Sequence, residues 1–283
     1  MTRMRTSTAT TRTANSHAAA ATLIAVWCAH WSSCGAAGLP PVDVRKPPLG
    51  FNTWNHFGMH PTEAVILETA ANFTSMGLQD AGYQFINTDD GWLSRNRSAA
   101  GSLVPMADQF PSGIAALTEK LHGMGFRFGI YACASEYTCG SRAGSLFNER
   151  RDAKTFARWG VDYLKFDDCG EMNLASYAKF NVMRDALNAA GRPMVYSFEP
   201  YTGTPKRWVP TVGNAWRTGP DALPTYASIM GNAFVNNMFV NLAGPGHFND
   251  ADMMVRRSAC LVTCSRRLTN AVYGMANVGN RER

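Results

Sequence analysis

Several signatures of common protein classes are missing from this 283-residue sequence. No Gly-x-Gly-x-x-Gly fingerprint follows a predicted strand, and no phosphate-binding loop is present, which argues against nucleotide binding. No cysteine pair has zinc-ribbon spacing, so we expect no metal site. The apolar stretch from about Ala18 to Trp27 is too short to span a bilayer. These absences favour a globular protein with no membrane span and no metal or organic cofactor.

Acidic residues are also absent from the first 40 residues, which are rich in Ser, Thr and Ala. Three arginines precede the apolar stretch, and the small residues Gly35-Ala-Ala-Gly38 follow it. This order is typical of a secretory signal. We interpret residues 1–38 as a signal or targeting segment and expect a secreted or extracytoplasmic protein. An organellar transit peptide is the alternative, because it shares the acid-poor composition.

The net charge of +6 lies at the two ends of the chain. Residues 1–46 carry +4 and residues 255–283 carry +5, which leaves −3 for the stretch between them. A mildly acidic body gives little support to nucleic-acid binding. We therefore expect no nucleic-acid partner.

Predicted strands alternate with predicted helices between residues 47 and 254. Strands are expected near residues 49–54, 83–88, 126–131, 161–166, 194–198, 214–217 and 246–249. Helices are expected near residues 62–76, 112–124, 148–159, 173–190 and 222–237. This alternation without a domain-breaking linker favours an α/β fold of the (β/α)8 TIM barrel type. A doubly wound open sheet is the alternative.

Polar residues gather directly after the predicted strands, as they do at the C-terminal mouth of a TIM barrel. They are Asp89 with Asp90, Tyr131, Lys165 with Asp167, Glu199, Arg217 with Asp221, and Asp250 with Asp252. A doubly wound sheet would usually bind its ligand at one switch point instead. The pattern therefore predicts an active site at the barrel mouth.

The strand predicted over residues 161–166 ends in the run Tyr163-Leu-Lys-Phe-Asp-Asp-Cys169. Lys165 and Asp167 are two residues apart, so on a strand they point to the same face. A cation beside a carboxylate keeps the carboxylate ionised, as a carboxylate nucleophile requires. The alternative is a structural ion pair at the strand end. We take Asp167 as the candidate nucleophile.

Asp221, in the run Trp216-Arg-Thr-Gly-Pro-Asp221, is the second candidate catalytic carboxylate. Retaining glycoside hydrolysis needs an ionised nucleophile and a protonated acid/base about 5–5.5 Å apart. Residues after the fourth and sixth strands could face each other in this way, and repulsion from Asp167 would favour a proton on Asp221. The alternative is that Asp221 caps a helix starting at Ala222.

Three further features could bind a sugar. Asp89 and Asp90 precede Gly91-Trp92 and offer acceptors beside an aromatic surface, although a polar turn is the alternative. Trp54 could stack on a pyranose ring or belong to the core. Glu199 could accept from a sugar hydroxyl or be a solvated loop carboxylate.

Five blocks carry a family resemblance: Leu49-Gly-Phe-Asn-Thr-Trp-Asn55, Asn87-Thr-Asp-Asp-Gly-Trp92, Tyr163-Leu-Lys-Phe-Asp-Asp-Cys169, Trp216-Arg217 with Asp221, and Gly246-His-Phe-Asn-Asp-Ala-Asp-Met253. In this order and spacing they resemble glycoside hydrolase family 27, the α-galactosidase and α-N-acetylgalactosaminidase family. The resemblance covers about residues 49–254.

The resemblance implies a retaining mechanism with Asp167 as the nucleophile and Asp221 as the acid/base. Positions that shape the galactose subsite of the family fall on Trp54, Asp89, Asp90, Tyr131, Cys139, Lys165, Glu199, Arg217 and Asp252. Cys139 and Cys169 fall on a pair that forms a disulfide in this family. Glu199 favours galactose over N-acetylgalactosamine, and the intact Asp89-Asp90 pair favours it over β-L-arabinopyranosides. The implied partner is an α-galactoside oligosaccharide or glycoconjugate, with a homodimer as a candidate assembly.

The sequence departs from the family at two places. Family members often carry a cysteine before the glutamate, paired with one before the Trp-Arg block, where this chain has Phe198 and Gly213. After Met254 the sequence changes into an atypical basic tail, residues 255–283, without a convincing eighth strand or the antiparallel β domain that usually follows. We therefore expect a barrel that is incomplete after the seventh strand.

The residues thus predict a secreted α-galactosidase whose catalytic barrel spans residues 47–254. A second hypothesis is an inactive, truncated remnant of the family in which the catalytic residues survive by descent. A third keeps the enzyme but changes the substrate to an α-N-acetylgalactosaminide or a β-L-arabinopyranoside.

Overall fold

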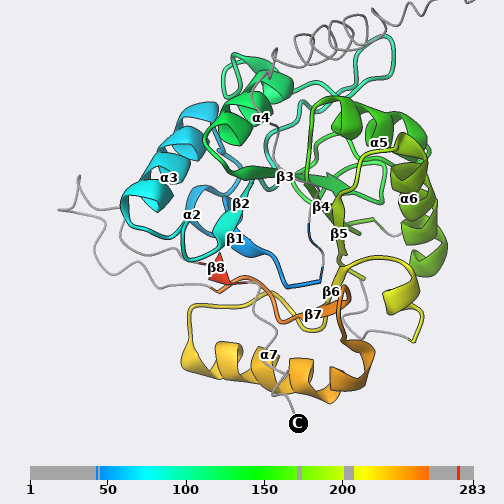
Figure 1. Cartoon of the computed structure of the whole chain (residues 1–283). Helices are drawn as coiled ribbons and strands as arrows, with labels where there is room; N and C mark the ends of the chain where they lie inside the picture. The colour runs from blue at the N-terminus through cyan, green and yellow to red at the C-terminus, as the bar shows by residue number, and fades with distance from the viewer. Residues whose placement is uncertain (1–42, 44, 171–173, 201–206, 255–272, 275–283) are drawn as a thin grey trace, which may run out of the picture. The chain divides into compact units, whose positions relative to one another are not determined.

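Seven parallel strands form a curled sheet that follows the order of the chain (Figure 1). The computed structural model describes residues 43, 45–170, 174–200, 207–254 and 273–274. The strands are β1 (Leu49–Asn52), β2 (Tyr83–Asn87), β3 (Arg127–Cys133), β4 (Tyr163–Asp167), β5 (Val195–Phe198), β6 (Ala215–Arg217) and β7 (Phe248–Asp250). Each pairs in parallel with the next, and β8 (Tyr273–Gly274) pairs antiparallel with β1. This arrangement is an incomplete (β/α)8 barrel, which confirms the expected fold class.

Helices lie outside the curled sheet in Figure 1. They are α2 (Trp54–Phe57), α3 (Glu63–Ser75), α4 (Gly113–Gly123), α5 (Glu149–Arg158), α6 (Ser176–Ala190) and α7 (Tyr226–Met238). Thr62, the first residue of the helix expected over 62–76, caps α3, because its Oγ1 accepts a hydrogen bond from the Val65 amide at 3.2 Å. None of the helices in the described part is both long and apolar enough to cross a membrane.

The core explains why the strands are nearly continuous apolar runs. All seven residues of β3 are buried, as expected for a parallel strand covered on both faces. Phe128 of β3 belongs to the same core cluster as Ile114, Leu117 and Leu121 of α4. These three α4 residues follow helical spacing, so one face of the helix packs on the sheet.

Two predicted boundaries need correction. The first strand ends at Asn52, whose Oδ1 accepts a hydrogen bond from the Trp54 amide at 2.9 Å, and Trp54 opens α2 instead of ending the strand. The helix expected from Ala222 begins at Tyr226, because the residue before Pro224 disfavours helical backbone. The cap of α7 is therefore Thr225, and the interpretation of Asp221 as a helix cap was wrong.

The structure describes little of the two end segments, residues 1–38 and 255–283, that the sequence separates from the barrel. The segment interpreted as a targeting signal, residues 1–38, lies outside the described residues, so secretion stays a prediction. Of the basic tail only residues 273–274 are described, and they form the antiparallel strand β8. All described residues belong to one compact unit, residues 39–283.

Candidate active site

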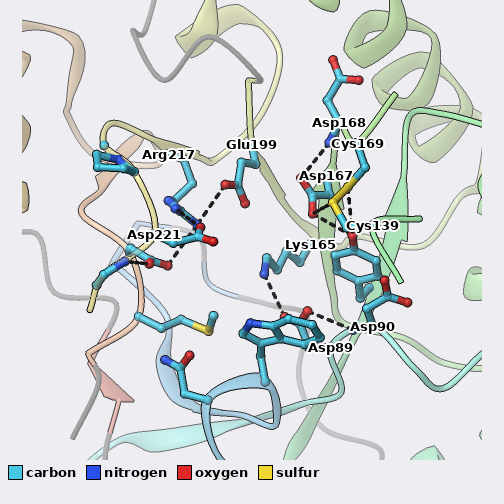
Figure 2. A pocket seen from close by; sticks show the side chains of 18 of the residues that line it. Asp89, Asp90, Cys139, Lys165, Asp167, Asp168, Cys169, Glu199, Arg217 and Asp221 are labelled. Atoms are coloured by element: carbon cyan, nitrogen blue, oxygen red, sulfur yellow. Dashed lines mark hydrogen bonds and ion pairs between the residues drawn. A yellow bond between two sulfur atoms is a disulfide. The ribbon is translucent and has the colours of Figure 1, made fainter. Parts of the chain in front are cut away.

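A pocket of about 820 Å³ opens at the C-terminal ends of the parallel strands (Figure 2). Every predicted site residue lines it: Trp54, Asp89, Asp90, Tyr131, Cys139, Lys165, Asp167, Glu199, Arg217, Asp221 and Asp252. They come from all seven parallel strand ends, although the sequence separates the first from the last by nearly 200 positions. The parallel barrel therefore brings the predicted residues together as expected.

Asp167, at the end of β4, has both carboxylate oxygens in hydrogen bonds. The Tyr131 hydroxyl donates to its Oδ2 at 2.7 Å, and the Asp168 amide donates to its Oδ1 at 2.8 Å. Burial first, and then the charge of Asp167, raise the pKa of Tyr131 well above its usual value. The phenol therefore stays protonated and serves as a donor that orients Asp167.

Lys165 lies on the same face of β4 as Asp167, as expected, and both line the pocket. Its direct partner is nevertheless Asp89, whose Oδ2 accepts from Nζ at 2.8 Å and from Asn52 Nδ2 at 2.8 Å. Burial alone would lower the pKa of Lys165, but the surrounding carboxylates, Asp89 foremost, outweigh it and raise the pKa. Lys165 is thus a fixed cation between Asp89 and Asp167.

Asp90 is held by three donors. Its oxygens accept from the Gly91 and Gly140 amides, each at 2.7 Å, and from the Thr138 hydroxyl at 3.0 Å. Burial raises the pKa of Asp90 in spite of these bonds. A Cβ on Gly140 would lie 2.8 Å from Asp90 Oδ2 and would also contact the Met59 side chain, so glycine favours this close approach. Asp90 is therefore both a pocket-lining residue and an anchor for the loop that carries Cys139.

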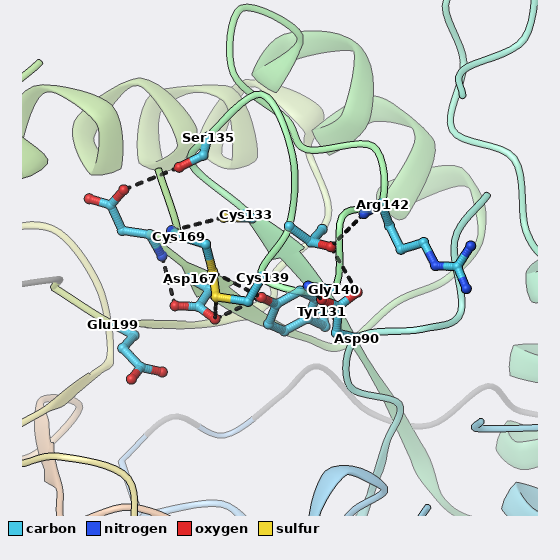
Figure 3. The surroundings of a disulfide bond; sticks show 12 residues. Asp90, Tyr131, Cys133, Ser135, Cys139, Gly140, Arg142, Asp167, Cys169 and Glu199 are labelled. Atoms are coloured by element: carbon cyan, nitrogen blue, oxygen red, sulfur yellow. Dashed lines mark hydrogen bonds between the residues drawn. A yellow bond between two sulfur atoms is a disulfide. The ribbon is translucent and has the colours of Figure 1, made fainter. Parts of the chain in front are cut away.

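The disulfide expected between Cys139 and Cys169 is present, with Cα atoms 5.1 Å apart (Figure 3). It joins the loop after β3 to the end of β4, and its Cys139 Sγ lies 3.6 Å from Oδ2 of Asp167. Together with Asp167 these sulfurs form a group at metal-ligand distances. Because a metal binds the thiolate and both sulfurs are bonded to each other, we interpret the group as a covalent brace beside Asp167.

Arg217, at the end of β6, faces three carboxylates on the other side of the pocket (Figure 2). Nη1 lies 3.1 Å from Glu199 Oε1 and 3.0 Å from Asp252 Oδ1, and Nη2 donates to Asp221 Oδ1 at 2.7 Å. The side chain of Arg217 is only 6% exposed, whereas that of Asp221 is 83% exposed. Asp221 is therefore accessible in the open pocket while its partner Arg217 is buried.

Glu199 lies between the two sides. Its burial, with repulsion from Asp167, raises its pKa to about 8, although Arg217 opposes this shift. Near neutral pH the carboxyl is thus largely protonated and can donate as well as accept a hydrogen bond. This differs from the alternative of a solvated loop carboxylate.

Asp252 adopts a backbone φ of 78°, in the left-handed region that non-glycine residues seldom occupy. Its amide donates to Asp250 Oδ1 at 2.9 Å, and its Oδ2 accepts from the Ala222 amide at 2.6 Å. These bonds hold the loop after β6 against the end of β7. A strained residue at a ligand-facing strand end is consistent with a functional site.

The sequence interpretation left out a buried ion pair behind Asp167. Asp168 pairs with Lys179 of α6, and its carboxylate also accepts from Ser135 Oγ at 3.3 Å and from Ser176 Oγ at 3.2 Å. Lys179 stands one turn before Met183 on the buried face of α6. A cation on an apolar helix face could have indicated a buried ion pair in the sequence. The pocket lining also includes Leu223, Val235 and Met253, which carry no polar signal.

Comparison with known proteins shows the family to which the chain is similar. The family model described as "Alpha galactosidase A" matches residues 55–276. The chain is 41% identical over 234 residues to an alpha-galactosidase of Cyamopsis tetragonoloba, covering 82% of this chain and 57% of the relative. It is 45% identical over 211 residues to alpha-galactosidase 3 of Arabidopsis thaliana, covering 74% and 48%. The chain thus spans about half the length of the curated relatives it matches.

Solved structures give the same result. Alpha-galactosidase I from Mortierella vinacea is similar with a TM-score of 0.70 and 34% identity, covering 75% of this chain and 59% of that one. The Saccharomyces cerevisiae alpha-galactosidase solved with raffinose has a TM-score of 0.68 and 32% identity, covering 76% and 54%.

Proposed function

Because the chain belongs to the alpha-galactosidase A family, glycoside hydrolase family 27, we propose that it removes terminal α-D-galactosyl residues from galactosides with retention of configuration. The observation that carries this proposal is Asp167, a carboxylate whose two oxygens are oriented by neutral donors at the base of a polar pocket. Asp221 approaches from the other side of that pocket.

In the first step Asp167 attacks the anomeric carbon, and the bond from that carbon to the leaving oxygen breaks. Asp221 donates its proton to this oxygen, so the leaving group departs as an alcohol. In the second step Asp221 takes a proton from water, which attacks the same carbon and releases Asp167. Both steps pass through an oxocarbenium-like transition state that the carboxylate of Asp167 stabilises.

The surrounding residues then bind the galactosyl group. Asp89, Asp90 and Lys165 offer acceptors and a fixed cation on one side, and Arg217 and Asp252 on the other. Trp54 and Tyr131 provide ring surface, and the disulfide of Cys139 limits the pocket beside Asp167. Glu199 hydrogen-bonds near the sugar 2-position and leaves little room for an acetamido group, so galactose is the preferred sugar. The substrate is an α-galactoside oligosaccharide or glycoconjugate.

The test is hydrolysis of p-nitrophenyl α-galactoside by the purified chain and by Asp167→Asn. We expect turnover in the wild type and its loss in the variant, because an amide is a poor nucleophile. Asp185→Asn, an exposed position on α6, is the matched control and should retain activity. A fluorinated galactosyl inhibitor that accumulates the covalent intermediate should label Asp167, as read by peptide mass spectrometry.

Near-normal turnover by Asp167→Asn would overturn the proposal. A panel of aryl glycosides tests the sugar: faster turnover of the α-N-acetylgalactosaminide or the β-L-arabinopyranoside than of the α-galactoside would overturn the substrate. A cooperatively melting wild-type chain that hydrolyses none of them would support the inactive remnant.

A further inference from the structure

A second hollow lies between α5 and the end of α6 and shares no residue with the active-site pocket. Its volume is about 690 Å³, and four of its eight lining residues are cations, with no acidic residue among them. The cations are Arg151, Lys154, Arg158 and Arg192, and we call this hollow the basic groove. Such a concentration is unexpected because residues 47–254 carry a net charge of −3.

Three of the cations stand on one face of α5. Arg151, Lys154 and Arg158 follow the spacing i, i+3 and i+7, and all three are exposed. Within the described ranges none of them makes an ion pair, so the protein supplies no counterion for their charge. The guanidinium of Arg151 lies against the backbone at Gly101, beside the groove lining. Their spacing corresponds to about 10 Å along the helix, at ~1.5 Å per residue.

Helix electrostatics does not explain this arrangement. Arg158 stands at the C-terminal end of α5, where a cation is favourable. Arg151 stands in the first turn, where the positive end of the helix dipole disfavours a cation. The helix dipole therefore does not account for Arg151, nor for the neighbouring Arg150 outside the groove.

Two of the guanidinium groups are held in place. Arg192 donates from Nε to the Val161 carbonyl at 3.0 Å and from Nη2 to Asp162 Oδ1 at 2.7 Å. Arg158 donates from Nη2 to Thr155 Oγ1 at 3.1 Å. Their remaining N–H groups are available, and a side chain already held loses less entropy on binding a ligand.

The groove continues into a neighbouring hollow of about 580 Å³. The two share Gly191, Arg192 and Pro193, and the second adds Arg184 and His247. This shape suits a chain of linked anionic groups better than one small anion. No aromatic side chain lines the basic groove, which disfavours single-stranded nucleic acid, since its bases need stacking surfaces.

We propose that the basic groove binds an acidic polysaccharide through the sulfate or carboxylate groups of its sugars. Anion binding follows from the groove alone, whereas the choice of a polysaccharide rests on the proposed galactosidase function. Attachment at a site separate from the active-site pocket would hold the enzyme on a polymer that carries its substrate and raise the local substrate concentration.

The experiment measures binding of the full chain to a heparin oligosaccharide, to polygalacturonate, to single-stranded DNA and to inorganic phosphate by isothermal titration calorimetry at several salt concentrations. The test variant carries Arg151→Gln, Lys154→Gln and Arg158→Gln. The control carries Arg95→Gln, Arg150→Gln and Arg207→Gln, which removes the same charge from exposed positions outside the groove. Arg150 is especially informative because it stands on α5 beside Arg151.

We expect the test variant to lose about 100-fold in polysaccharide affinity, at about tenfold or less per cation, and the control to lose less than about threefold. Wild-type affinity should fall linearly with salt on logarithmic axes. Heparin and polygalacturonate then distinguish sulfate from carboxylate as the preferred group. Hydrolysis of p-nitrophenyl α-galactoside should be the same in both triple variants.

Equal losses in the two triple variants would overturn the proposal in favour of general charge attraction, as would tighter binding of single-stranded DNA than of either polysaccharide. Binding of phosphate alone would also overturn it. Binding is measured without turnover, so an inactive wild type contradicts the galactosidase function and leaves this result intact. Both triple variants replace exposed residues, and matched thermal melts check that they fold.

Discussion

The two sides of the active-site pocket are built differently. On the β4 side, Asp167 is fixed by Tyr131 and the Asp168 amide, a disulfide crosses beside it, and the pair of Asp168 with Lys179 lies buried behind it. On the β6 side, the exposed Asp221 forms an ion pair with Arg217 and with no other cation of the described residues. A nucleophile must stay fixed, whereas an acid/base must exchange protons with water, and the two sides suit the roles proposed for Asp167 and Asp221.

The helices outside the sheet also differ in which side chains they bury. On the β2–β3 side, α4 buries Ile114, Leu117 and Leu121 against the core. The buried residues of α7 are Asn232 and Asn236. Four of its large apolar residues are exposed and lie four positions apart, in the order Tyr226, Met230, Phe234 and Met238, whereas Ile229 and Val235 are half-buried. Among the described residues, α7 thus buries two amide side chains and exposes four large apolar ones, whereas α4 buries its apolar face.

The two buried asparagines of α7 bind the pocket loops through amide hydrogen bonds. Asn232 Nδ2 donates to the Pro220 carbonyl at 2.8 Å and to the Ala251 carbonyl at 3.1 Å. Asn236 Oδ1 accepts from the Thr218 hydroxyl at 3.0 Å. The loop that carries Asp221 is thus positioned by directional contacts, which can hold a geometry with little buried area.

The largest expected effect separates the two carboxylates by their dependence on the leaving group. Asp221→Asn should lose about 10²–10⁴-fold in kcat/KM on an oligosaccharide, whose leaving alcohol needs a proton. It should lose much less on p-nitrophenyl α-galactoside, whose leaving group departs readily as an anion. Asp167→Asn should lose activity on both, and steady-state kinetics with the two substrates checks this.

Parallel losses for the two variants on both substrates would contradict the assignment of Asp221. The substrate pair is its own control, because misfolding would lower both rates by the same factor.

Replacing one buried and one exposed phenylalanine tests the contrast between the core beside α4 and the exposed face of α7. Phe128→Ala in β3 should lower the free energy of unfolding by about 3–5 kcal/mol, because its side chain is fully buried. Phe234→Ala in α7 should change it by less than about 0.5 kcal/mol, because Phe234 is 70% exposed. Urea unfolding of both variants gives the comparison. A loss of several kcal/mol for Phe234→Ala would show that its apolar face is covered in solution.

The ion pairs of the two sides should also differ. Lys179→Met leaves Asp168 buried without its cation and should lower stability by about 3–5 kcal/mol. Asp221→Asn removes a pair whose carboxylate is exposed and should cost less than about 1 kcal/mol. The double variant Lys179→Met with Asp168→Asn should recover part of the loss, because no buried charge then remains unpaired. Equal effects of the two single variants, measured by urea unfolding, would contradict the contrast.

Sequence reasoning could predict what depends on local pattern. The parallel strand ends, the cap at Thr62 and the pocket position of Asp167 follow from apolar runs, capping chemistry and barrel geometry. The partner of Lys165 could not be predicted, because Asp89 is 76 residues away in the sequence. Lys165 nevertheless donates to Asp89 and not to Asp167, which is only two residues away. The start of α7 depends on Pro224, whose effect on Leu223 competed with an otherwise helical pattern.

The paired departure at Phe198 and Gly213 has a structural explanation that the sequence alone did not supply. A Cβ built on Gly213 would lie 3.0 Å from the Phe198 ring and 2.7 Å from the Tyr196 carbonyl oxygen. The two positions are thus in contact, and the large ring occupies space that glycine leaves free. Phe198 also stacks on Trp208, with ring centroids 5.9 Å apart, so packing joins this region where family members often have a disulfide.

The last expected effect concerns Glu199, which lies between the two sides. Its pKa rises from an ordinary 4.5 to about 8 in the folded protein, so between these values the folded state binds more protons at this site than the unfolded state. Stability from this group is therefore present below about pH 4.5 and declines as pH rises toward 8. We expect a decline of about 3–4 kcal/mol between pH 5 and pH 8 that Glu199→Gln lacks, with other carboxyls cancelling in the difference. Urea unfolding of both proteins at the two pH values measures it. An identical pH dependence in the wild type and Glu199→Gln would mean that the ion pair with Arg217 keeps Glu199 ionised throughout this pH range. A second negative charge would then lie near Asp167 in the pocket.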